Sequence, residues 1–330
     1  MPVPAYGDLV VSILAASLPV TMPILYASIG EVYAERSGVL NMGIEGVIGL
    51  SALVSLWVTF STGSYLFGLL AAMITGAAMG VLHSFATVKI GINQLIAGLL
   101  IYTLAGGIAD FAYRIITRTS FPTINVLPPA HIPILSDLPV VGPILFSQNI
   151  LVYASFAVAI VLGLILYRTA WGLKIRAVGE NPEAADAAGI NVNRVRHLCV
   201  ILGAVLAGVA GASLVLGYLG LYIAGDNLVA GRGWIAIVVV IFARWSPYKA
   251  IAGSWLFGLG YSIAATFQGS GIFSTGKHGD RAKPERVLPD NVSVHIESHP
   301  QGAVVKLKDR VFGRSPLNLR FRPGITYELA

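Results

Sequence analysis

The chain of 330 residues is too poor in charge for an ordinary soluble protein, because 12% of its residues are charged and 55% are hydrophobic, whereas a soluble domain is roughly a quarter charged. Its formal net charge of +6 does not indicate a nucleic-acid-binding protein, since much of the basic excess lies near the C-terminus, outside the hydrophobic body. The composition therefore predicts an integral membrane protein.

Eight apolar stretches follow one another along the chain, and a helix needs about 20 apolar residues to cross a bilayer. The stretch at 228–243 is short and contains Gly231 and Arg232, which is typical of a half-helix or re-entrant segment enclosed in protein. We predict an all-α polytopic membrane protein with about eight transmembrane helices. The stretches are 8–29, 42–60, 65–86, 93–113, 148–167, 198–223, 228–243 and 250–267.

The basic residues of the connections predict the orientation, because positively charged loops stay in the cytoplasm. The connection 168–197 carries the strongest signal, with Arg168, Lys174, Arg176, Arg194 and Arg196. If it is cytoplasmic, alternation also places Arg36, Lys89 and the turn 244–249 inside. The Pro-rich connection 114–147 and both ends of the chain are then expected outside.

Polar side chains at membrane depth are costly and mark candidate contacts with a solute. Asn41 and Glu45 lie at the start of the second stretch, and Asn93 with Gln94 enters the fourth. We interpret these four residues as candidates to line a translocation path. Alternatively, Glu45 lies at the water interface and the amides join helices by hydrogen bonds.

Two other charged residues receive different interpretations. Asp110 is near the outer end of the fourth stretch and is interpreted as an interfacial residue. Arg232 stands between Gly231 and Gly233, so we interpret it as a backbone-positioning or gating residue rather than a solute ligand.

The basic connection also predicts a short cytoplasmic helix. Asn181 is a favourable N-cap, Pro182 suits the first helical position, and Glu183 favours the positive end of a helix. Gly189 ends the helix, and the residues between are mostly helix-forming alanines: Ala184, Ala185, Ala187 and Ala188. Such a helix with small side chains can fit a groove on a partner protein, and the alternative is a connector without a partner.

Four segments of the chain are distinctive: 35–46 (ERSGVLNMGIEG), 90–98 (IGINQLIAG), 171–189 (WGLKIRAVGENPEAADAAG) and 230–236 (AGRGWIA). In this collinear order they resemble the ABC importer permeases related to the branched-chain amino acid, ribose and nucleoside systems. The resemblance covers roughly residues 8–268. It implies that the third segment couples to an ATPase through Gly179, Glu180, Asn181, Pro182, Glu183, Ala184, Ala185, Ala188 and Gly189.

The resemblance also implies an assembly. In that family two permease subunits form the pathway, two cytoplasmic ATPase subunits drive it, and an extracytoplasmic binding protein delivers the solute. We therefore expect a multi-pass permease subunit of a bacterial inner membrane that is not an enzyme and binds no cofactor, metal or nucleic acid. The nucleoside and simple-sugar branch implies a solute of that kind.

The segment from Gly271 to Lys277 has the spacing of a Walker A nucleotide-binding loop but lacks its chemistry. His278 stands where the loop needs a Ser or Thr hydroxyl for the magnesium ion. The segment also follows an apolar span where a β-strand would be required. We assign no nucleotide site here and expect ATP hydrolysis on another polypeptide.

After the apolar body (1–268), the chain becomes polar, with a linker at 269–290 and strand-like alternation at 291–330. The segment 298–303 (SHPQGA) resembles the PEGA domain, a small β-sandwich, although Gln301 replaces the motif's Glu. We predict a partial PEGA-like domain. Because the permease family continues with further apolar helices, we interpret the boundary as a join of two unrelated fragments, with a genuine fusion or a natural truncation as alternatives.

Two other functions compete with the permease. One is a secondary transporter driven by an ion gradient, for which Glu45 alone gives thin support. The other is a membrane-anchored envelope protein that displays the PEGA-like tail. The predicted coupling helix and the absence of an acceptable Walker motif favour the permease.

Overall fold

The computed structural model describes residues 6–118, 121–130, 133, 135–136, 138–225, 228–269, 292–296, 304–307, 310–314 and 317–321. The chain divides into two units, Met1–Ser270 and Gly271–Ala330, and each is described by itself. The Walker-like segment and the remainder of the predicted linker from residue 270 onward lie outside the described residues.

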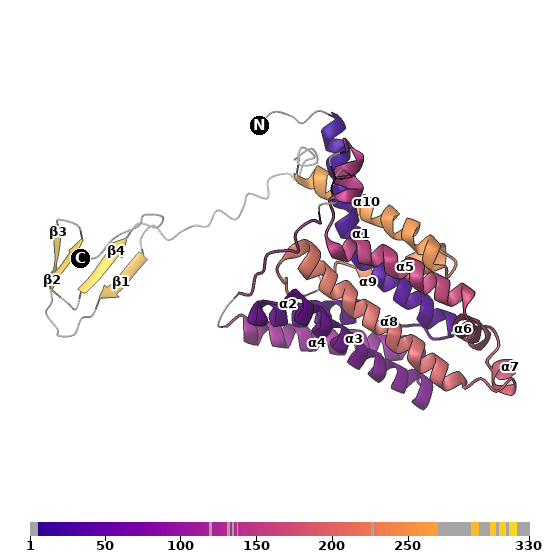
Figure 1. The fold of residues 1–330 in the computed structure, drawn as a ribbon. Helices are drawn as coiled ribbons and strands as arrows, with labels where there is room; N and C mark the ends of the chain where they lie inside the picture. Colours follow the sequence, from indigo (N-terminus) through magenta and orange to yellow (C-terminus); the bar gives the residue numbers. More distant parts are fainter. Residues whose placement is uncertain are drawn as a thin grey trace, which may run out of the picture. The chain divides into compact units, whose positions relative to one another are not determined.

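The first unit is a bundle of helices (Figure 1). In chain order they are α1 Tyr6–Arg36, α2 Ile44–Thr62, α3 Tyr65–Ser84, the π-helical turn η1 Phe85–Ile90, α4 Gln94–Ile116, η2 Gly142–Phe146, α5 Ile150–Arg168, α6 Ala170–Glu180, α7 Pro182–Ala187, α8 Val192–Leu214, η3 Val215–Leu219, α9 Arg232–Phe242 and α10 Pro247–Gly269.

Within the described part of the chain, seven helices are long and apolar enough to cross a membrane. The helix α9 has 11 residues, which corresponds to about 16 Å at 1.5 Å per residue, about half of the hydrocarbon thickness. The prediction of about eight transmembrane helices is therefore corrected to seven, and the stretch at 228–243, which was interpreted as a half-helix or re-entrant segment, forms this short helix.

The bundle is built around α1 and α8, whose backbones meet at glycines. A Cβ atom on Gly30 would lie 2.6 Å from the carbonyl oxygen of Gly203, and one on Gly76 of α3 would lie 2.2 Å from the carbonyl oxygen of Ala204. Membrane helices associate through such small residues because close backbone approach maximises packing contacts. Large buried side chains such as Met22 and Leu25 fill the remaining core.

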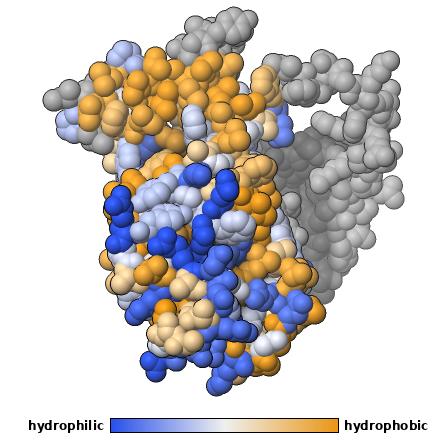
Figure 2. All heavy atoms as spheres, turned by 90° about the vertical axis from the view of Figure 1, so that its right-hand side faces the viewer, coloured by the Kyte–Doolittle hydropathy of each residue, from blue (hydrophilic) through white to orange (hydrophobic). Residues whose placement is uncertain are grey.

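The connections gather at two ends of the bundle. At one end, Arg36 contacts the α9–α10 turn and the Nε of Arg196 donates to the carbonyl oxygen of Ser37. This end carries α6 and α7, and hydrophilic side chains gather on the face that they form (Figure 2). We call it the cytoplasmic end, following the predicted orientation. At the other end, the amide of Ile124 donates to Gly220.

Among the described residues of the second unit there are four strands in two antiparallel pairs. β1 Val292–Ile296 pairs with β4 Leu317–Phe321, and β2 Val304–Leu307 pairs with β3 Arg310–Arg314. All four lie within residues 291–330, where the sequence predicted strand-like alternation. Two separate two-stranded pairs do not support the predicted PEGA-like β-sandwich, since a two-stranded pair alone is marginally stable.

Candidate functional site

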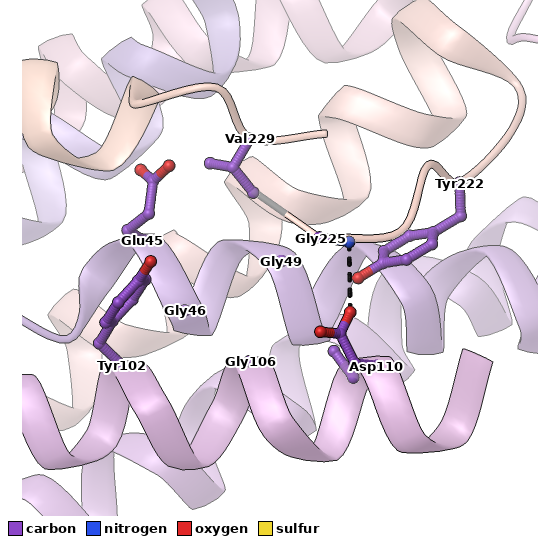
Figure 3. A pocket seen from close by; sticks show the side chains of 10 residues that line it. Glu45, Gly46, Gly49, Tyr102, Gly106, Asp110, Tyr222, Gly225 and Val229 are labelled. Carbon is purple, nitrogen blue, oxygen red and sulfur yellow. Dashed lines mark hydrogen bonds between the residues drawn. The ribbon is translucent and has the colours of Figure 1, made fainter. Parts of the chain in front are cut away.

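A pocket lies between α2, α4 and the segment that precedes α9 (Figure 3). Its cavity volume is about 50 Å³, smaller than the roughly 300–1,000 Å³ of small-molecule sites, so the pocket is a narrow cleft in this structure. Four of the lining residues are glycines: Gly46 and Gly49 on α2, Gly106 on α4 and Gly225 in the segment before α9. The lining consists of Glu45, Gly46, Gly49, Tyr102, Gly106, Ala109, Asp110, Tyr222, Gly225 and Val229.

Glu45 lies at one end of this pocket and is 4% exposed. One carboxylate oxygen accepts the backbone N–H of Gly231 at 2.8 Å, and the other accepts that of Gly233 at 2.6 Å. These N–H groups belong to the first turn of α9, which has no partners for them within the helix. Glu45 therefore lines the pocket and also caps α9 from a different helix, at the positive end of its dipole.

Asp110 and Tyr222 form the other end of the pocket. Asp110 accepts the backbone N–H of Gly225 at 3.2 Å. Burial, the nearby Asp110 charge and Tyr113 raise the pKa of Tyr222 to about 12, so its hydroxyl stays protonated at neutral pH and can donate a hydrogen bond. Sequence reasoning placed Asp110 at an interface, and the structure shows that it also lines the pocket.

The pocket combines acceptors for hydrogen bonds with aromatic surface. Glu45 and Asp110 provide carboxylates, while the Tyr102 ring lies beside Glu45 (Figure 3) and meets the Trp234 ring edge-on, with ring centres 5.8 Å apart. Such a lining suits a small solute that carries hydroxyl or amine donors. Among the described residues, no group of three or more His, Cys, Asp or Glu side chains could hold a metal ion.

The other three predicted path residues lie outside this pocket. Asn41 is 2% exposed, and its side-chain oxygen accepts the N–H of Gly43 at 3.0 Å. Asn93 is exposed and caps α4 by accepting the N–H of Leu95 at 3.0 Å. Of the four candidates, only Glu45 lines the pocket.

Gln94 holds the connection between α1 and α2. Its side chain accepts the N–H of Leu40 at 2.8 Å and donates to the carbonyl oxygen of Gly38 at 3.1 Å. Two buried residues that the sequence interpretation missed assist it. A carboxylate oxygen of Glu31 accepts the N–H of Asn41 at 2.7 Å, and the Nε2 of His83 lies 3.2 Å from the carbonyl oxygen of Leu40.

Arg232 is 7% exposed, and its side chain forms hydrogen bonds with the backbone that precedes α9. Its Nη1 donates to the carbonyl oxygens of Leu228 at 3.3 Å and Val229 at 2.9 Å. The guanidinium also lies over the Tyr261 ring, 4.9 Å from its centre, a favourable cation–π geometry. These contacts fit the predicted backbone-positioning role.

The predicted cytoplasmic helix is present as α7. The Asn181 side chain accepts the N–H of Ala184 at 3.0 Å, which confirms the predicted N-cap, and Gly189 adopts φ +79° after the helix. Ala185 is 4% exposed and packs in a cluster with Val178. A partner can therefore reach the exposed residues Glu183, Ala184, Asp186, Ala187 and Ala188, but not Ala185.

The comparisons with known proteins agree on one family. Residues 13–280 match the family model described as branched-chain amino acid transport system / permease component. The chain is 37% identical over 250 residues to a putative glucose ABC transporter permease protein of Haloferax volcanii, covering 75% of each chain. No solved structure matches.

Two other relatives are similar at the same level. Identity is 34% over 261 residues with a nucleoside ABC transporter permease protein of Lactococcus lactis, covering 76% of this chain and 81% of that protein. It is also 34% over 275 residues with a guanosine ABC transporter permease protein of Bacillus subtilis, covering 77% and 83%. These matches support the permease part, and the PEGA resemblance of the tail receives no support from them.

Proposed function

Since this chain belongs to the family of branched-chain amino acid transport system permease components, and is thus an ABC transporter permease subunit, we propose that it carries a nucleoside-like or simple-sugar solute through the pocket at Glu45. The names of the relatives support this choice of solute, because they are permeases for glucose, nucleosides and guanosine. The pocket supports it through two carboxylates, Glu45 and Asp110, and two tyrosines, Tyr102 and Tyr222, which can bind hydroxyl groups and aromatic rings.

The proposed path continues from Glu45 toward Asn41, Asn93 and Gln94 at the cytoplasmic end. There the exposed side of α7, within the segment Gly179 to Gly189, contacts a cytoplasmic ATPase subunit. The second permease subunit and an extracytoplasmic binding protein complete the importer in a bacterial inner membrane. The observation that carries the proposal is Glu45, a buried carboxylate that both lines the pocket and holds α9.

Uptake of labelled guanosine and glucose tests the proposal in proteoliposomes that contain the full chain, its ATPase and its binding protein. We expect ATP-dependent accumulation of one of these solutes, and a fall in accumulation per assembled complex in Glu45→Gln. The chain without the ATPase should hydrolyse no ATP, and Lys277→Ala should change nothing. The function would be contradicted by ATP-independent uptake that follows an ion gradient, as a secondary transporter would show.

A further inference from the structure

The helix α9 is held at both ends by side chains from other helices. We propose that α9 links the cytoplasmic end of the bundle to the candidate solute pocket, with Arg36 and Glu45 as the positioning residues at its two ends. This inference rests on the proposed function for its role in transport, and it names the element through which the ATPase acts on the pocket.

The cytoplasmic end of α9 is a turn in an unusual conformation. Arg244 and Trp245 both have positive φ, 52° and 55°, where glycine is the ordinary choice at the end of a helix. The turn closes α9, since the N–H of Trp245 donates to Val240 at 3.0 Å. Two consecutive non-glycine residues in this region persist only where the surroundings hold them.

Side chains from two other helices hold this turn. The Nε of Arg36 donates to the carbonyl oxygen of Trp245 at 3.2 Å, and its Nη2 donates to that of Arg244 at 3.3 Å. The indole N–H of Trp245 donates to Glu35, and the hydroxyl of Tyr167 at the end of α5 donates to the Trp245 carbonyl oxygen at 3.3 Å. The turn is therefore fastened to the last residues of α1 and α5.

The predicted coupling segment contacts the same point. A Cβ atom on Gly179 of α6 would lie 2.1 Å from the carbonyl oxygen of Arg36, so the α6 backbone lies directly against the residue that holds the turn. The helix α7 follows α6 immediately. A movement of α7 and α6 therefore reaches Arg36 without an intervening side chain.

At its other end, α9 begins at the carboxylate of Glu45. Gly231 starts the helix with φ +80°, and both Glu45 oxygens are occupied by N–H groups of Gly231 and Gly233. A helix of 11 residues moves as a rigid rod of about 16 Å. Displacement of the turn at Trp245 therefore shifts the N–H groups that hold Glu45 in the pocket.

A thiol in the pocket reports this linkage. Gly106 lines the pocket, and a Cβ added there would meet no atom within 4 Å, so Gly106→Cys fits. Cys199 is the single cysteine of the chain and is buried; Cys199→Ala removes it. The full chain with both changes is labelled with a membrane-impermeant thiol reagent in nanodiscs, and the reaction rate is measured.

Arg36→Gln or Trp245→Phe is then added to this chain to release the turn. The labelling rate at position 106 should rise about threefold or more, because the turn and the pocket are energetically coupled. Arg36→Lys keeps the charge but cannot span two carbonyl oxygens as a guanidinium does, so its rate should be intermediate. Lys249 is an exposed residue near the start of α10. Lys249→Gln removes its charge and should leave the labelling rate unchanged.

The linkage would be overturned if Arg36→Gln and Trp245→Phe left the labelling rate of the Gly106→Cys, Cys199→Ala chain unchanged. This result counts only if both proteins also unfold at the same temperature as that chain. If Arg36→Gln does not fold, Trp245→Phe decides, because it removes the hydrogen bond to Glu35 and part of an indole ring that is 37% exposed, while both Arg36 hydrogen bonds to the turn can still form. The measurement needs neither ATPase nor solute. A negative result therefore contradicts the linkage and leaves the permease function standing, whereas absence of solute uptake by the unaltered chain contradicts the function.

Discussion

The backbone of Gly233 lies so close to Glu45 that no residue larger than glycine fits at position 233. The N–H of Gly233 donates to the Glu45 carboxylate at 2.6 Å, and a Cβ atom on Gly233 would lie 2.7 Å from the Cα of Glu45. The start of α9 and the wall of the pocket are therefore parts of one structure. A change at Glu45 should affect both the stability of the fold and the binding of a solute.

Glu45→Ala should lower the free energy of unfolding by about 2 kcal/mol or more, because it leaves the buried N–H of Gly233 and the half-buried N–H of Gly231 without this acceptor and each such loss costs about 1–3 kcal/mol. Glu45→Gln keeps one acceptor oxygen and should cost less. Thermal unfolding of the purified chain measures the order of the three proteins. Equal unfolding temperatures for Glu45→Ala and the unaltered chain would contradict the capping role.

Gly46→Ala should abolish uptake, while Gly106→Ala should preserve it, although both glycines line the pocket. A Cβ atom on Gly46 would lie 2.6 Å from the carbonyl oxygen of Tyr102 and would push α4 away from α2, whereas one on Gly106 would meet nothing within 4 Å. Alanine also favours the helix over glycine. The measurement is uptake per assembled complex, and equal losses in both variants would contradict this assignment of the packing.

Asn93 separates a capping role from a path role. The Asn93 side chain caps α4, and loss of an N-cap costs about 1 kcal/mol, so Asn93→Ala should reduce folded protein. Asn93→Ser retains a good cap but removes the amide. If Asn93 also lines the path, as proposed, uptake per assembled complex should fall in Asn93→Ser while the protein level holds. Normal uptake by Asn93→Ser would remove Asn93 from the path.

Hydropathy predicted most of the bundle because each long span is a continuous apolar run, but it failed at the end of α1. The first stretch was expected to end at residue 29, since Glu31, Glu35 and Arg36 interrupt the apolar pattern. The helix continues to Arg36, because the folded chain supplies partners for these charges: the N–H of Asn41 for Glu31 and the indole of Trp245 for Glu35. Those partners are contributed by the tertiary structure.

The pocket shows the same limit. Glu45 was found from its polarity at membrane depth, but Tyr102, Asp110 and Tyr222 are ordinary residues in their own segments. They meet only because α2, α4 and the segment before α9 converge. By contrast, the cap of α7 was predictable, since Asn181 and Pro182 act within one turn of the helix.

Cross-linking from α7 tests the proposed ATPase contact, and burial decides which positions to use. Ala184 and Ala188 are exposed, while Ala185 is 4% exposed and packs inward. In a Cys199→Ala chain purified with its ATPase, a thiol-reactive photo-cross-linker on Ala184→Cys or Ala188→Cys should capture the ATPase. Ala185→Cys should label poorly and capture little, because its thiol would be enclosed by the apolar cluster that contains Val178.

Ser61→Cys supplies the matched control, because Ser61 is also exposed but lies in the last turn of α2, away from the cytoplasmic end. Its thiol should label fully and capture no ATPase. Absence of cross-links from both Ala184→Cys and Ala188→Cys, in complexes that still contain the ATPase, would contradict α7 as the contact. Capture from Ser61→Cys at the same yield would show that the cross-links do not report a specific surface, so the comparison of these positions carries the conclusion.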